Sequence, residues 1–437
     1  MIDSPTSKTR QGSQPNLNST PETPLSQETG TQPPKYRWVV MGFLWSLNLV
    51  IPMTAMSIGV MLPSMTEELG ITPVQAGMLG GVWFFGSAVV SLPASIWLSR
   101  YSPKRITFLS LLLSGCTVLL QGWAPAFISL LVFRFLFVIV AVSRMQAEVL
   151  LIHQWFAPRQ IGTVLGVSTG MMVIGQMIAV GLTPYLLIAL SGWRNVYYAL
   201  GLIMIAMACL WVIIGRERSQ ARSTENKGNQ DQSPINVLRT YKFLWILAAA
   251  PSGAALAFSA VMTFWPTLAL ETLPLSLTEV GSLMTVFLLG GMAAAFAAAP
   301  LSSRIRRRKP FLWLAGILLP PLYVALFTTN SIFIAGLLLF LAGWNAQIWV
   351  PIIRTIPFDL QLAPRETAVA TGLGMTLLPI VGAMGPPLVG LVQEITGSLE
   401  IGLLSIIAFP LTLVIGGFLI PETSPNRNGT TARDSEH

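Results

Sequence analysis

Twelve long apolar runs dominate this sequence of 437 residues and limit what it can fold into. Each run has roughly the 17 to 25 residues that an α-helix needs to cross about 30 Å of hydrocarbon. A chain in lipid must satisfy its backbone hydrogen bonds internally, so we expect an all-α membrane protein with twelve transmembrane helices. The runs cover 38–62, 75–98, 106–123, 127–151, 162–189, 193–214, 244–266, 277–300, 311–328, 332–353, 367–392 and 400–420.

A polar stretch separates the first six runs from the last six. We expect 215–243 to be a cytoplasmic linker between an N-terminal six-helix bundle, 37–214, and a C-terminal six-helix bundle, 244–420. The ends of the chain, 1–36 and 421–437, are polar and contain no apolar run. We expect both to be disordered cytoplasmic tails, and the first is not a cleaved secretory signal.

The two groups of six runs are related by an internal repeat. "APRQIGTVLG" from Ala157 aligns without gaps with "APRETAVATG" from Ala363, and "QAGMLGGVWFFG" from Gln75 aligns with "EVGSLMTVFLLG" from Glu279. A parallel duplication of a six-helix unit explains both alignments. Small residues at every fourth position predict helix stripes that allow close, sliding contact. The stripes contain Gly77, Gly81, Gly162, Gly166, Gly170, Gly281, Thr285, Ala368, Gly372 and Thr376.

The basic residues are concentrated in loops on one side of the predicted membrane. They follow the second, fourth, sixth and eighth runs, whereas the opposite loops carry Arg194 alone. Because basic loops resist translocation, we expect both termini in the cytoplasm of a multi-pass bacterial inner-membrane protein. The same rule explains the net charge of +8 and the run "RIRRRK" without a nucleic-acid partner. We expect a monomer in the lipid bilayer.

Several common kinds of site are excluded. With two cysteines inside apolar runs and two histidines, one of them terminal, we expect neither a metal nor another cofactor. "GVSTG" at 166–170 matches a hydrolase nucleophile motif, but it lies in a helical stripe without a histidine partner. No Gly-Lys pair occurs, so a phosphate-binding loop is absent from the sequence. We therefore expect that the protein is not an enzyme.

Twelve spans in two parallel-repeated halves resemble the major facilitator superfamily of secondary transporters. "QWFAPRQIGTVLG" and "GWRNVYYALG" are similar to the segment linking the fourth to sixth spans in its anion:cation symporter and nitrate or oxalate porter branches, and Arg134 matches the family's membrane-embedded arginine. "SIWLSRYSPKR" is similar to the loop after the second span, with Ser99 in place of an aspartate. The resemblance implies secondary active transport by alternating access, with gating roles for Arg100 and its counterpart Arg304.

Two arginines within 127–151 are candidates for substrate binding. Each costs about 2.5 to 3.5 kcal/mol at the centre of a bilayer, which favours a role for both Arg134 and Arg144. Either could present a guanidinium fork to an anion. Alternatively, Arg134 makes a structural hydrogen bond to another helix, and Arg144 reaches the headgroups or pairs with Glu148 four residues later.

In the family, the first, fourth, seventh and tenth spans line a central cavity. No Asp or Glu lies in the middle of the first, seventh or tenth span, so the walls are net positive. This favours a small organic or inorganic anion as substrate, with a proton or counter-substrate as coupling partner. The further substrate-binding candidates are Asn48, Trp265, Trp344, Asn345 and Gln347.

The repeat also suggests an inner gate. It pairs Glu148 with Arg354, and His153 with Asp359, at the cytoplasmic ends of the fourth and tenth spans. We hypothesise that Glu148, Arg354 and Asp359 contribute to a gate that forms when the cavity faces outward.

Two other functions remain open at this point. A drug or metabolite exporter would fit the aromatic residues Trp265, Trp344 and Trp349. A non-transporting sensor or assembly protein would fit the altered loop after the second span.

Overall fold

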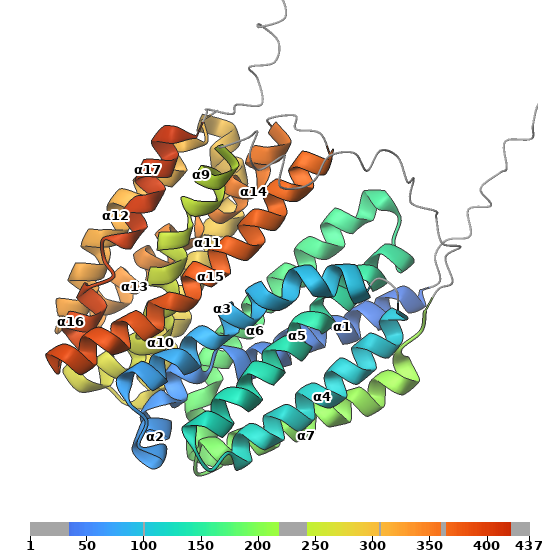
Figure 1. The fold of residues 1–437 in the computed structure, drawn as a ribbon, viewed down its shortest axis with the longest axis horizontal. Coiled ribbons are helices and arrows are strands. Elements are labelled where there is room, and N and C mark those ends of the chain that lie inside the picture. The colour runs from blue at the N-terminus through green and yellow to red at the C-terminus, as the bar shows by residue number, and fades with distance from the viewer. Residues whose placement is uncertain (1–34, 99–100, 218–242, 306, 360–363, 421–437) are drawn as a thin grey trace, which may run out of the picture.

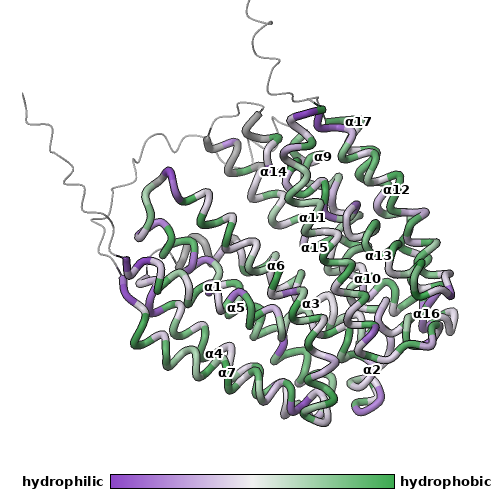
Figure 2. Tube along the Cα trace, turned by 180° about the vertical axis from the view of Figure 1, so that it is seen from behind, coloured by the Kyte–Doolittle hydropathy of each residue, from purple (hydrophilic) through white to green (hydrophobic). Residues whose placement is uncertain are grey.

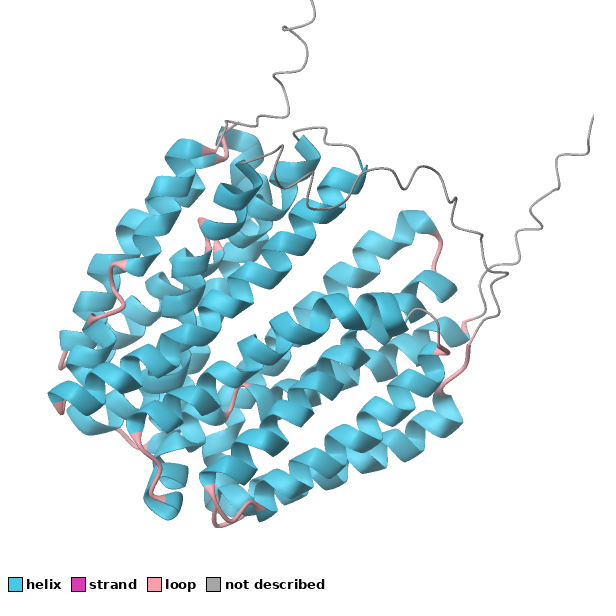
Figure 3. Ribbon diagram, in the orientation of Figure 1, coloured by secondary structure: helices cyan, strands magenta, loops and turns pink. Residues whose placement is uncertain are grey.

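The computed structural model describes residues 35–98, 101–217, 243–305, 307–359 and 364–420. Every regular element in these ranges is a helix, and short loops join the helices (Figure 3). The N-terminal half contains α1 (Tyr36–Ala55), α2 (Ile58–Leu69), α3 (Pro73–Leu98), α4 (Pro103–Trp123), α5 (Phe127–Trp155), α6 (Pro158–Ala189) and α7 (Trp193–Ile214). The C-terminal half contains α9 (Phe243–Ala249), α10 (Ser252–Thr272), α11 (Leu277–Ile305), α12 (Lys309–Thr328), α13 (Ile332–Gln347), α14 (Val350–Asp359), α15 (Pro364–Thr396), α16 (Leu399–Leu404), η1 (Phe409–Leu411) and α17 (Thr412–Leu419).

Twelve spans in the described part of the chain are long and apolar enough to cross a membrane. They coincide with the twelve predicted runs, with ends that differ by up to seven residues, so the predicted twelve-helix architecture is confirmed. Figure 2 shows the hydrophobic colour running along these helices. Large apolar side chains are exposed on the outside, for example Phe333 at 84% and Phe296 at 71%. Such exposure is expected of a surface that faces lipid rather than water.

Prolines explain why three of the spans are interrupted. A proline lacks the N–H that would bond to the carbonyl four residues earlier. Pro52 removes the helical donor for the carbonyl of Asn48, and α1 ends three residues later. Pro251 follows the end of α9, and Pro351 removes the donor for Gln347, the last residue of α13. These breaks leave backbone carbonyls inside the bundles that other groups can bind.

The helices form two bundles, which touch at one end and diverge toward the other (Figure 1). The diverging end is the one at which α1 and α9 begin and α7 and α17 end. We call it the linker end, and we call the opposite end the closed end.

Small residues allow the bundles to touch at the closed end, where α3 packs along α15, α6 along α11, and α2 against α10. A Cβ added to Gly77 of α3 would lie 2.3 Å from the carbonyl oxygen of Pro386 in α15. A Cβ on Gly281 of α11 would lie 2.6 Å from Cγ of Pro184 in α6. Two of the predicted stripes of small residues therefore lie at the contact between the bundles.

The predicted stripe of small residues on α6 faces open space. A Cβ added to Gly162, Gly166 or Gly170 of α6 would meet no atom of the described residues within 4 Å, and the same is true of Gly374 in α15. Both helices contact the opposite bundle near the closed end and separate from it toward the linker end (Figure 1). The molecule is therefore open at the linker end.

Candidate functional site

Arg134 lies on α5 and is 1% exposed. Its Nε donates to the carbonyl of Leu79 on α3 at 2.9 Å, and Nη1 and Nη2 donate to the carbonyls of Thr54 and Ala55 at 3.2 and 2.8 Å. Thr54 and Ala55 are the last residues of α1, so the guanidinium supplies donors that the interrupted helix lacks. Arg134 thus makes the hydrogen bonds to other helices that were the alternative to substrate binding in the sequence analysis.

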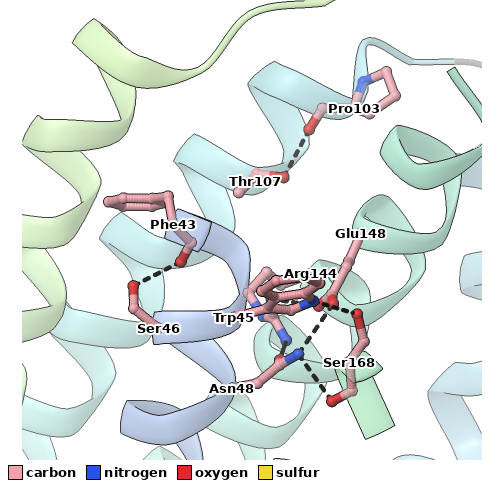
Figure 4. Close-up of polar contacts among 9 residues, drawn as sticks. All are labelled: Phe43, Trp45, Ser46, Asn48, Pro103, Thr107, Arg144, Glu148 and Ser168. Atoms are coloured by element: carbon pink, nitrogen blue, oxygen red, sulfur yellow. Dashed lines mark hydrogen bonds and ion pairs between the residues drawn. The ribbon is translucent and has the colours of Figure 1, made fainter. Parts of the chain in front are cut away.

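Arg144 lies ten residues further along α5, roughly 15 Å nearer the linker end at 1.5 Å per residue. Its Nη1 pairs with Oε2 of Glu148 at 2.9 Å, and its Nη2 donates to Oδ1 of Asn48 at 2.7 Å. Nδ2 of Asn48 donates in turn to Oε1 of Glu148 at 3.0 Å. The three side chains form a closed triangle between α1 and α5 (Figure 4). Each of them is at most 5% exposed.

Burial makes the two charges of this triangle depend on each other. An unpaired buried ion costs several kcal/mol of desolvation, which only a close partner offsets. Glu148 neutralises Arg144, whose buried Nε has no hydrogen-bond partner among the described residues. A group that displaces Glu148 from Arg144 must therefore bring its own negative charge.

Trp45 and Ser168 extend the network to α6, although neither was predicted from the sequence. Nδ2 of Asn48 lies 3.4 Å from the backbone oxygen of Ser168, and the Ser168 hydroxyl accepts from Nε1 of Trp45 at 3.0 Å (Figure 4). A Cβ on Gly175 of α6 would lie only 2.2 Å from the carbonyl oxygen of Asn48. Ser168 belongs to the "GVSTG" segment, and a serine within an apolar run was the available signal.

A small pocket, about 20 Å³ in volume, lies beside the triangle. Its polar lining consists of Arg144, Asn48 and Gln176, and it contains no carboxylate. The other lining residues are apolar or aromatic: Ile51, Pro52, Ala55, Met56, Trp83, Met145 and Met172. The pocket therefore offers one cation and two amides in a largely apolar wall. In the described part of the chain, no three His, Cys, Asp or Glu side chains could hold a metal ion.

The candidates in the C-terminal bundle do not line this pocket. Asn345 donates to a carbonyl one turn earlier in its own helix at 2.8 Å. Gln347 packs against Gly291 of α11, Trp265 is 1% exposed in the core, and Trp344 is half-buried. Their role in substrate binding stays a prediction.

The predicted gating residues whose side chains the structure describes are not brought together. Arg354 of α14 and Arg304 of α11 are exposed at the linker end, whereas Glu148 is held inside the N-terminal bundle. Asp359 is the last residue of α14, a position whose side chain is not described, and Arg100 lies outside the described residues. A gate between Glu148 and Arg354 stays a prediction for the conformation in which the linker end is closed.

The closed end contains a polar contact between the bundles. Oε1 of Glu394 on α15 accepts from the backbone N–H of Val74, in the first turn of α3, at 3.2 Å. That turn has no acidic residue of its own. The corresponding helix of the repeat, α11, instead has Glu279, which accepts from the backbone N–H of Ser276 at 2.8 Å. A carboxylate at a helix N-terminus is stabilising, and α3 receives it from the opposite bundle.

Known transporters resemble this chain in sequence and fold. A probable sulfoacetate transporter from Cupriavidus necator is 20% identical over 84% of this chain and 90% of its own length. A hexuronate transporter from Bacillus subtilis is 23% identical over 41% of this chain and 43% of its own length. The inward-facing, unoccupied structure of a bacterial homologue of the human lysosomal transporter Spinster has a TM-score of 0.70 and 17% identity, covering 88% of this chain and 95% of that one.

A family profile covers nearly all of the helical part of the chain. The Major Facilitator Superfamily profile matches residues 44–272 and 252–437, and the two matches overlap over α10. The structure of a D-xylose–proton symporter has a TM-score of 0.70 with 13% identity, and covers 89% of this chain and 99% of that one. Profile, repeat and twelve-span fold agree, and the chain belongs to the Major Facilitator Superfamily.

Proposed function

We propose that this protein is a secondary active transporter that carries a small organic anion by alternating access. The observation that carries the proposal is the buried Arg144–Glu148–Asn48 triangle beside a pocket. Arg144 is held by a carboxylate of the protein, which a carboxylate or sulfonate of a substrate can replace. Guanidinium groups bind such anions through two parallel hydrogen bonds, which fixes the orientation of the substrate.

Replacement of Glu148 gives a route to coupling. Once a substrate anion occupies Arg144, an ionised Glu148 would be a buried, unpaired charge, so it takes up a proton. Anion and proton then bind together, and the loaded site stays electrically neutral. We propose a proton as the coupling partner. When no proton gradient is present, the protein exchanges one anion for another.

The relatives support an organic anion as substrate, because sulfoacetate and hexuronate, after which two of them are named, are organic anions. The pocket lining supports it independently, since it contains one cation and no carboxylate. A hydrophobic cationic drug would need the opposite charge in the wall. The exporter hypothesis is therefore less well supported.

The basic residues support an orientation. Arg304, Arg307 and Arg354 are exposed at the linker end. Because cytoplasmic loops carry the excess of basic residues, we propose that the linker end faces the cytoplasm, with both termini on that side of a bacterial inner membrane. The conformation described here is then the inward-open one.

Flux into vesicles tests the proposal. The protein is reconstituted in liposomes, and uptake of labelled carboxylates, sulfonates and hydrophobic cations is measured with and without an inward proton gradient. We expect gradient-driven uptake of at least one anion, lost in Arg144→Gln and retained in the matched control Arg307→Gln. Uptake of cations alone, or of no compound, contradicts the proposal, and binding without flux supports a sensor.

A further inference from the structure

We propose that the substrate is a monoanion with one carboxylate or sulfonate head and a largely apolar body. Dianions and polyhydroxylated acids are disfavoured. This inference rests on the proposed function, because it assumes that the anion binds at Arg144. It goes further by naming the charge and the polarity of the substrate.

The charge of the substrate follows from the ionisable groups at the pocket. Arg144 is the one cation among the lining residues, and Glu148 can accept one proton. A monoanion that replaces Glu148 leaves the site neutral once that proton is bound. A dianion leaves one negative charge without a partner in a buried site, which is strongly unfavourable.

The second embedded arginine does not change this balance. Arg134 is 1% exposed, and its guanidinium donates to the carbonyls of Thr54, Ala55 and Leu79. It is not among the residues that line the pocket. Reaching a second anionic group would require it to leave three hydrogen bonds, so we count Arg144 alone as the anchor.

The polarity of the substrate body follows from the remaining wall. Three methionines, Met56, Met145 and Met172, lie beside Trp83 and Ile51, and thioethers adapt readily to apolar ligands. A hydroxyl buried against such a wall loses its water and gains no partner. This lowers affinity by roughly tenfold or more for each hydroxyl. Gln176 adds one amide, which is enough for a single polar substituent.

The substrate proposed for this chain differs from the substrates named for two of its relatives. Sulfoacetate carries two acidic groups, and hexuronates carry several hydroxyls. A site with one cationic anchor and a methionine-rich wall matches neither pattern. At 20 to 23% identity, the pocket residues of those proteins can differ from those found here.

Hexanoate, gluconate and adipate share six carbons and test both parts of the inference. Hexanoate is an apolar monoanion, gluconate a hydroxylated monoanion and adipate an apolar dianion. The melting temperature of the purified full-length protein is measured against the concentration of each at neutral pH, because a ligand of the folded state raises it. Hexanesulfonate, which stays ionised, controls for uptake of a protonated acid into detergent.

We expect hexanoate and hexanesulfonate to bind at least about tenfold more tightly than gluconate or adipate. Arg144→Gln should abolish this binding, and binding that survives the substitution overturns the inference. Equal or tighter binding of adipate or gluconate overturns the inference and leaves the proposed function standing. If none of these anions binds, and neither sulfoacetate nor glucuronate binds, the inference and the proposed function are both overturned.

A matched pair of substitutions tests the wall directly. Met172→Gln adds an amide to the pocket and should reduce the preference for hexanoate over gluconate by about threefold or more. Met171→Gln makes the same change next to it, at a residue that does not line the pocket, and should leave the preference unchanged. If Met172→Gln and Met171→Gln prefer hexanoate over gluconate to the same degree, the apolar wall does not have the role assigned to it.

Discussion

Asn48 of α1 and Arg144 of α5 are 96 residues apart in sequence and are joined by a 2.7 Å hydrogen bond inside the N-terminal bundle. The same amide donates to Glu148 at 3.0 Å. Asn48 therefore holds both members of the ion pair and ties the first span to the fourth beside the pocket.

Replacing Asn48 with Leu should weaken anion binding roughly tenfold, because Arg144 and Glu148 each lose a buried partner. Each lost partner costs about 1–3 kcal/mol, so the melting temperature should also fall. Ser46→Ala is the control, since the Ser46 hydroxyl donates to the carbonyl of Phe43 in its own helix. Equal effects of the two substitutions on binding would contradict the bridging role.

Replacing Arg134 with Met should destabilise the fold and leave substrate affinity nearly unchanged. Three buried carbonyls lose their donor, and the combined cost is about 3 kcal/mol or more. Thermal unfolding measures the loss, and ligand titration of the remaining folded protein measures affinity. A normal melting temperature with lost binding would place Arg134 in the substrate site after all.

Gly175→Ala should impair both stability and transport, because the added Cβ would lie 2.2 Å from the carbonyl oxygen of Asn48. Forcing α6 away from α1 costs roughly 1–3 kcal/mol and separates Ser168 from Asn48. Gly166→Ala on the same helix meets no atom within 4 Å in the described part of the chain, and its melting temperature should match that of the wild type. If the unfolding curves of the two variants coincide, the close approach of α6 to α1 at Gly175 is unimportant.

Glu394→Gln should favour opening of the closed end, because it removes the charge that α15 gives to the N-terminus of α3. The expected change is about 0.3–1 kcal/mol, which is up to roughly fivefold in the ratio of the two conformations. Distances between spin labels on α2 and α16 measure it after the native cysteines are replaced. Glu279→Gln, which removes a carboxylate from within one bundle, should leave the distances unchanged, and equal shifts in both variants would exclude a latch between the bundles.

The twelve spans and the repeat could be predicted because they depend on local hydrophobicity and on sequence similarity within one chain. The Arg144–Glu148 pair was also accessible, since four residues separate its members on one helix. These features need no knowledge of how the helices pack.

The contacts of Arg134 and Asn48 could not be predicted in the same way. Arg134 bonds to backbone carbonyls 55 to 80 residues away, and two of these carbonyls belong to the last residues of α1. The amide of Asn48 reaches Ser168 across 120 residues, through a helix approach that Gly175 permits. Both arrangements depend on tertiary packing, so two arginines in one apolar run have different environments.

The most direct test of anion exchange at Arg144 is the affinity of Glu148→Gln for the best-binding anion, measured by calorimetric titration across a range of pH, with Glu279→Gln as control. Because the substitution removes the carboxylate that competes for Arg144, binding should become about tenfold tighter or more and lose its dependence on pH. Weaker binding, or a pH dependence equal to that of the wild type, would contradict a substrate that replaces Glu148.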